Sequence, residues 1–136
     1  MVKLVLGLKG LGKTKVLIEQ ANQAVKNDDG NIICIEKGNK LTYDLSHKIR
    51  LIDIDCYNVK DFSHMLTFIS GILAGDYDVS TIFIDSIMKI CGDNYDEFEK
   101  FLTDISSIND KKFFITASAD EKTVPAAIKK YMINID

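Results

Sequence analysis

Gly7-Leu8-Lys9-Gly10-Leu11-Gly12-Lys13-Thr14 is the stretch of this 136-residue chain that decides its fold class. It fits the pattern G-x-x-x-x-G-K-[ST] at every fixed position. Glycines let the backbone curl tightly enough to point several N–H groups inward at an anion. In this pattern the lysine reaches phosphate oxygens and the threonine hydroxyl binds magnesium. The stretch therefore predicts a loop that holds a polyphosphate.

The residues on either side of the loop support this interpretation. Val2 to Leu6 is an apolar run in which only Lys3 is charged, so it predicts a buried strand that leads directly into the loop. From Thr14 onward apolar residues recur at helical spacing, and residues 27–30 form a stop. The partial positive charge at the start of this helix would face the phosphates. Strand, loop and helix follow one another as the motif requires.

On these residues the chain resembles the P-loop NTPase superfamily. The resemblance is strong over residues 2 to 26 and schematic beyond them. It implies one nucleotide-binding domain over residues 1–136, with ATP and Mg²⁺ as ligands. The residues it assigns to the nucleotide are those of the loop and the helix start, together with one from a later strand: Gly7, Leu8, Lys9, Gly10, Leu11, Gly12, Lys13, Thr14, Lys15 and Thr116. Lys13 would also act in catalysis, and Thr14 would be a metal ligand.

The rest of the chain alternates between strand-like and helix-like segments. Helical stripes run over residues 59–73, with Asn58 as the expected N-cap, and over residues 95–108. We expect further strands at 32–35, 49–54, 81–85, 113–116 and 131–135, and one arm of a hairpin within 37–48. This alternation predicts a three-layer α/β/α sandwich around a mostly parallel sheet of five or six strands. Ligands of such sheets lie at the carboxyl ends of the strands.

A magnesium nucleotide needs a second acidic group near the metal. Ile82-Phe83-Ile84-Asp85, preceded by Thr81, is similar to the Walker B pattern, so the resemblance makes Asp85 the magnesium carboxylate. Asp53 and Asp55 also follow apolar residues and remain alternatives.

Hydrolysis needs a group that orients the attacking water. The residue after Asp85 is Ser86, so the chain departs from ATPases that carry a glutamate there. Glu36 ends the strand after the loop helix, as the catalytic glutamate does in RecA-like relatives, and would act as the general base. The alternative is a solvated glutamate at a strand end. Thr116 or Ser118 resembles a polar sensor of the γ-phosphate.

Positive charge is unevenly divided between sixteen lysines and a single arginine, Arg50. The arginine-rich lid of small nucleotide kinases therefore cannot form. Arg50 begins a strand, at the sheet edge opposite the phosphates, so we expect a structural role for it. Fast hydrolysis would need a cation from a lysine, from a protein partner or from a second copy of the chain. The chain has no N-K-x-D guanine signature, which leaves adenine as the default base.

Composition limits the partners, the location and the cysteine chemistry that we expect of this protein. The chain is 46% hydrophobic and 27% charged, with a net charge of −3, so no broad attraction to nucleic acid is expected. No apolar run approaches the length that crosses a bilayer, and we expect no membrane insertion and a cytoplasmic location. Cys34, Cys56 and Cys91 show neither disulfide nor zinc spacing, and we expect Cys34 in a strand core.

Three functions fit these observations. The first is a Mg-ATP-binding protein with slow or partner-activated ATPase activity, a small stand-alone domain on the RecA-like and twitching-motility ATPase side of the superfamily. The second is a binding module that senses ATP without turnover, which the Ser86 departure and the scarcity of arginine favour. The third is a small phosphotransferase, which the absence of a lid disfavours.

Overall fold

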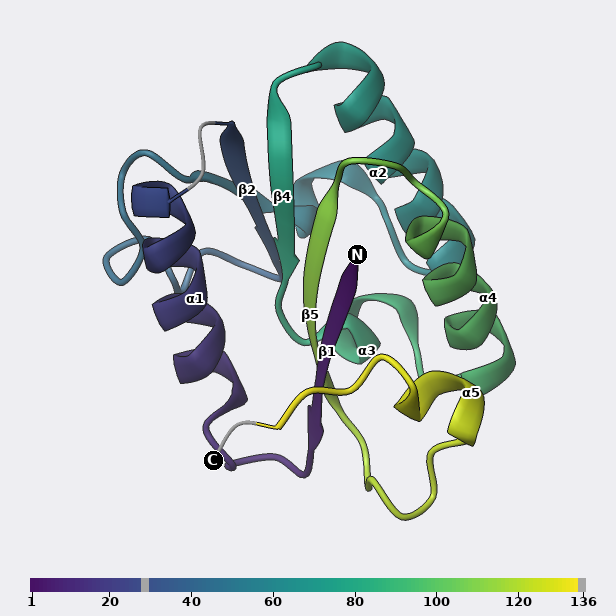
Figure 1. Cartoon of the computed structure of the whole chain (residues 1–136). Coiled ribbons are helices and arrows are strands. Elements are labelled where there is room, and N and C mark those ends of the chain that lie inside the picture. The colour runs from purple at the N-terminus through teal and green to yellow at the C-terminus, as the bar shows by residue number, and fades with distance from the viewer. Residues whose placement is uncertain (28–29, 135–136) are drawn as a thin grey trace.

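The computed structural model describes residues 1–27 and 30–134 (Figure 1). Its strands are β1 (Val2–Gly7), β2 (Asn31–Glu36), β3 (Arg50–Asp53), β4 (Val79–Ile84) and β5 (Lys112–Ser118). Its helices are α1 (Lys13–Asn27), α2 (Phe62–Gly75), α3 (Ile87–Cys91), α4 (Tyr95–Ser106) and α5 (Ala126–Lys129), with a 3₁₀ turn at Ile54–Tyr57.

All five strands form one parallel sheet in the order β1-β5-β4-β2-β3. Because every strand runs the same way, all carboxyl ends meet at one edge. The register pairs Gly7 with Ser118 and Ile84 with both Ile35 and Ile115. The glycine-rich loop therefore starts beside the end of β5, and Asp85 follows β4 at the same edge. The predicted fold class is confirmed.

Both faces of the sheet are covered, so consecutive strand residues are apolar, as in Ile32 to Ile35 and Ile82 to Ile84, rather than alternate ones. On one face Val5, Cys34 and Phe83 pack against α1 and the segment after β2. On the other face Leu4, Ile84 and their neighbours pack against α2, α3, α4 and α5. Figure 1 shows α1 alone on its side of the sheet and α2 and α4 on the opposite side. Cys34 is fully buried in the first of these cores, as expected.

The second long helix begins later than the sequence predicted. α2 starts at Phe62, and its N-cap is Asp61, whose Oδ1 accepts a hydrogen bond from the backbone N of His64 at 2.7 Å. Asn58 is not the cap. It ends the 3₁₀ turn in the left-handed conformation (φ 57°), which asparagine tolerates better than most residues. This turn buries Val59 in the core ahead of the helix.

The prediction of a hairpin arm within residues 37–48 is wrong, because this segment consists of turns and bends. Leu41, Leu45 and Ile49 point into the core under α1. Asn22 of α1 ties the segment down, since its side chain donates to the carbonyl of Asp44 at 3.0 Å and accepts from the backbone N of Ser46 at 2.7 Å. Burial of every fourth residue under one helix replaces the predicted strand pairing.

The last strand expected around residues 131–135 is reduced to one isolated parallel bridge between Leu4 and Met132. Leu4 donates to the carbonyl of Tyr131 and accepts from the N–H of Ile133, at 2.9 and 2.8 Å. The segment thus lies along the free side of β1 for a single residue pair. Ile135, the end of the expected strand, and Asp28 and Asp29 of the expected helix stop lie outside the described residues. Among the described helices, none has the length and apolar character needed to cross a bilayer.

Candidate functional site

The glycine-rich loop between β1 and α1 owes its shape to two glycines. Gly10 and Gly12 have φ values of +89° and +81°, a region that other residues rarely adopt. A Cβ at either position would meet no atom within 4 Å, so the backbone here borders open space. Across residues 1–27 and 30–134, no acceptor is found for the backbone N–H groups of residues 12–15. These amides, at the positive end of a 15-residue helix, are suited to an anion.

The side chain of Lys13 folds back against the loop. It is only 7% exposed, and its Nζ donates to the carbonyl of Leu8 at 2.8 Å. Burial lowers the pKa of its ammonium group, and the nearby Asp85 carboxylate opposes this shift. An ammonium group has three donors, so two remain for other acceptors.

Thr14, Asp85 and Thr116 form one hydrogen-bonded cluster at the carboxyl edge. The Thr14 hydroxyl donates toward both oxygens of Asp85 at 3.2 Å, and the Thr116 hydroxyl donates to Asp85 Oδ1 at 2.8 Å. Thr116 also accepts from the backbone N of Ser86 at 2.7 Å. β5 lies between β1 and β4 in the sheet. The cluster therefore joins the glycine-rich loop after β1, Thr116 on β5, and Asp85 at the end of β4. Hydroxyl and carboxylate oxygens are ligands that suit Mg²⁺, which binds proteins through few groups and keeps phosphates and waters as its other ligands.

Glu36 is buried (3% exposed) and lies at the same edge on β2. Its two oxygens accept from the backbone N–H groups of Lys40 and Leu41, at 3.2 and 2.9 Å. Burial raises the pKa of this carboxyl group, the two backbone hydrogen bonds oppose the shift, and the charges of Asp85 and Asp53 add to it. Glu36 is therefore not the solvated strand-end residue of the alternative interpretation. Its carboxylate holds the turn after β2 closed, and its expected catalytic role stays a prediction.

Asp53, the competing magnesium candidate, ends β3 at the same edge. Its Oδ1 accepts from the backbone N–H groups of Gly38 and Asp55, at 2.9 and 3.0 Å. It therefore caps a turn, whereas Asp85 contacts the threonine of the loop. The neighbouring Asp55 forms an exposed ion pair with Lys37.

A pocket of about 500 Å³ opens in front of the loop. Its cations are four lysines, and no carboxylate is among the residues that line it: Lys9, Gly10, Gly12, Lys13, Thr14, Lys15, Ser86, Met88, Lys89 and Ser118. Such a surface attracts an anion. Ser118 reaches this pocket, whereas Thr116 is 1% exposed beneath it.

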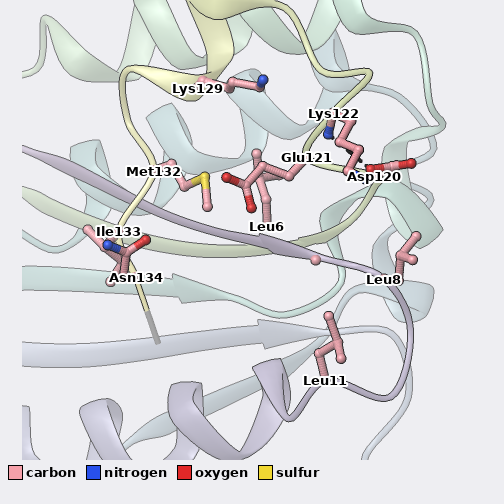
Figure 2. A pocket seen from close by; sticks show the side chains of 11 residues that line it. Leu6, Leu8, Leu11, Asp120, Glu121, Lys122, Lys129, Met132, Ile133 and Asn134 are labelled. Carbon is pink, nitrogen blue, oxygen red and sulfur yellow. Dashed lines mark hydrogen bonds between the residues drawn. The ribbon is translucent and has the colours of Figure 1, made fainter. Parts of the chain in front are cut away.

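A second hollow, of about 510 Å³, lies on the other side of the loop. Leu8 and Leu11 form its wall from the loop, and they are 57% and 60% exposed. Figure 2 shows the opposite wall, made by Met132 and its neighbours near the C-terminus and by the segment after β5, which includes Glu121. Besides these apolar side chains, two acidic and two basic residues line the hollow: Asp120, Glu121, Lys122 and Lys129.

Two features of the site were not predicted from the sequence. Ser86 takes the left-handed conformation (φ 56°), and the short helix α3 that follows it brings Lys89 to the lysine-lined pocket. Neither the left-handed backbone of Ser86 nor the placement of Lys89 in the pocket could be predicted from residue type or local spacing. Arg50 begins β3 and is exposed at the amino end of the sheet, away from the loop, as expected.

One solved structure with a similar fold is the flagellar accessory protein FlaH from Methanocaldococcus jannaschii. The TM-score is 0.57 at 17% sequence identity, over 95% of this chain and 65% of that protein. The fold that this chain shares with FlaH is RecA-like. At this identity the likeness concerns the fold alone, and this chain spans less than two thirds of the length of FlaH. No protein-family model and no curated protein matches the sequence.

Proposed function

We propose that this protein binds Mg-ATP and hydrolyses it slowly, or quickly only with a partner. The observation that carries the proposal is the contact of Thr14, which lines a pocket together with four lysines, with the buried carboxylate of Asp85. The RecA-like fold supports it, because ligands of such sheets lie at the carboxyl edge where this contact is found.

In this proposal the phosphates lie against the backbone N–H groups of residues 12–15 and the ammonium group of Lys13. The loop residues Gly7 to Thr14, with Lys15, form the cradle. Thr14 and Asp85 hold Mg²⁺, which neutralises and orients the phosphate oxygens when it is bound. Thr116 keeps Asp85 in place through its 2.8 Å hydrogen bond and so acts as a positioning residue.

The hollow of Figure 2 is suited to the nucleoside. It shares Leu8 and Leu11 with the loop, and these exposed leucines offer apolar surface to a base. The charges in this hollow offset one another, since Asp120 and Glu121 line it together with Lys122 and Lys129. The pocket on the other side of the loop has four lysines and no carboxylate, so the tail of the nucleotide belongs there. A carboxylate such as that of Glu121 can accept from the amino group of adenine.

Slow turnover follows from what surrounds the pocket. Arg50, the single arginine of the sequence, lies at the other end of the sheet, and Ser86 occupies the place after Asp85. Glu36 is the expected general base, but both its oxygens already accept backbone hydrogen bonds. Rapid hydrolysis therefore requires the turn after β2 to release Glu36, or a cation from a protein partner or second copy.

The same two hydrogen bonds of Glu36 favour a second candidate function, an ATP sensor without turnover. In that case the carboxylate serves only to close the turn, and binding alone is the signal.

Calorimetric titration of ATP and Mg²⁺ tests the binding. Lys13→Ala should weaken affinity at least tenfold, because a charge-assisted contact to phosphate contributes about 1.5–3 kcal/mol. Lys26→Ala removes the same charge at the far end of α1 and should leave affinity unchanged. Equal affinity of wild type and Lys13→Ala, or no binding by the wild type, would contradict the proposal.

Phosphate release separates the two candidates. Turnover by the wild type that Glu36→Gln abolishes supports the ATPase. Binding without phosphate release in either protein supports the sensor.

A further inference from the structure

Lys89 stands apart from the other lysines of the pocket. Lys9, Lys13 and Lys15 all belong to the loop and the start of α1, whereas Lys89 comes from α3, on the far side of the pocket. Its side chain is exposed, and within the described part of the chain it has no hydrogen bond or ion pair. Its ammonium group is therefore available to an anion in the pocket.

The position of Lys89 is set by the edge of the sheet. α3 follows Asp85 and Ser86 directly, and the backbone N of Lys89 donates to the carbonyl of Ser86 at 3.0 Å. Ile87 and Ile90 on either side of it are buried in the core, which holds the helix against the sheet. Lys89 therefore projects from an anchored turn and not from a free loop.

The order of groups in the site indicates which phosphate Lys89 would meet. The hollow suited to the nucleoside adjoins Gly7 and Leu8, and the loop amides come next. Lys89 and Ser118 line the pocket on the other side of the loop. A polyphosphate tail that starts in the hollow and crosses the loop ends near these two residues.

We propose that Lys89 binds the terminal phosphate of a nucleoside triphosphate, so that the site prefers triphosphate to diphosphate. This inference rests on the proposed nucleotide binding. Arg50 lies at the opposite end of the sheet, and Lys89 is the cation that the chain itself brings to the pocket from outside the loop and α1. The third phosphate adds charge that ADP lacks, and a facing ammonium group responds to that difference.

The test measures the affinities of the full chain for ADP and for a β,γ-imido analogue of ATP, both with Mg²⁺. The variants are Lys89→Met, which keeps most of the apolar stem, and Lys89→Arg, which keeps the charge. Lys26→Met is the matched control, at the exposed C-terminal turn of α1. Thermal unfolding of each variant checks that the fold is retained.

We expect Lys89→Met to weaken binding of the analogue about tenfold and binding of ADP less than about twofold. Lys89→Arg should retain most of the preference for the analogue over ADP. Lys26→Met should change neither affinity. Equal losses for both nucleotides, or no loss in Lys89→Met, would overturn the role of Lys89 while leaving the proposed function intact. Failure of the wild type to bind either nucleotide would overturn both.

Discussion

The Thr14 hydroxyl lies 3.2 Å from both carboxylate oxygens of Asp85, although 71 residues separate them in the chain. Thr14 stands in the first turn of α1, and Asp85 follows the strand two places away in the sheet from β1. Thr116, on the strand between them, donates to the same carboxylate. Three elements thus fix one carboxylate next to the hydroxyl of the glycine-rich loop.

This relationship predicts how magnesium affects nucleotide binding. Asp85→Asn keeps the size of the side chain and removes its charge, so affinity for ATP with Mg²⁺ should fall at least tenfold. Affinity for ATP with a chelator should not fall, because the lost charge repels phosphate. Calorimetric titration with and without Mg²⁺ measures both values.

Asp53→Asn is the matched control for that experiment. Asp53 lies at the same sheet edge, but its Oδ1 caps the turn at Gly38 and Asp55. The substitution should leave the magnesium effect unchanged. If Asp53→Asn removes the effect and Asp85→Asn does not, the assignment of the metal carboxylate is wrong.

Two glycines give a prediction for stability. A Cβ on Gly30 would lie 2.6 Å from the backbone oxygen of Asp78 and 2.6 Å from the Cβ of Ser80. Gly30→Ala should therefore lower the free energy of unfolding by about 1–3 kcal/mol, as overpacking does. Gly71, inside α2, has no neighbour within 4 Å of that position, so Gly71→Ala should raise it by about 0.5–1 kcal/mol. Urea unfolding measures both changes, and a stable Gly30→Ala would show that β2 does not approach β4 this closely.

Glu36 gives a prediction for pH. Burial raises the pKa of its carboxyl group above the value in the unfolded chain. Its contribution to stability is then greatest below the unfolded pKa and is lost as pH rises through the folded pKa. The free energy of unfolding of the wild type, relative to Glu36→Gln, should fall as the pH rises from the ordinary carboxyl range, at about pH 4, through the raised pKa of Glu36. Urea unfolding at a series of pH values checks this, and a difference that rises with pH would contradict it.

The sequence predicted the parallel sheet, because short apolar runs such as Val2–Leu6, residues 32–35 and Phe113–Thr116 alternate with helical stripes. It also indicated that Asp85 and the loop share one edge, since each follows a strand. The position of Thr116 beneath Asp85 depends on β5 lying between β1 and β4, which no local pattern encodes.

Other features depended on tertiary packing. One arm of a hairpin was predicted within residues 37–48, but there Leu41 is buried under α1 and Tyr43 is 98% exposed in a turn. Asn58 and Asp61 are both good caps by residue type, and burial of Val59 decides between them. The hydrogen bonds of Glu36 come from a turn whose path no sequence pattern fixes.

The most direct test of nucleotide binding is a crystal structure of the protein grown with the β,γ-imido analogue and Mg²⁺. We expect the phosphates within the loop of residues 7–14, with Lys13 Nζ turned from the carbonyl of Leu8 to a phosphate oxygen. The metal should lie between Thr14 and Asp85. Well-ordered analogue bound elsewhere, with Lys13 still donating to Leu8, would contradict the account.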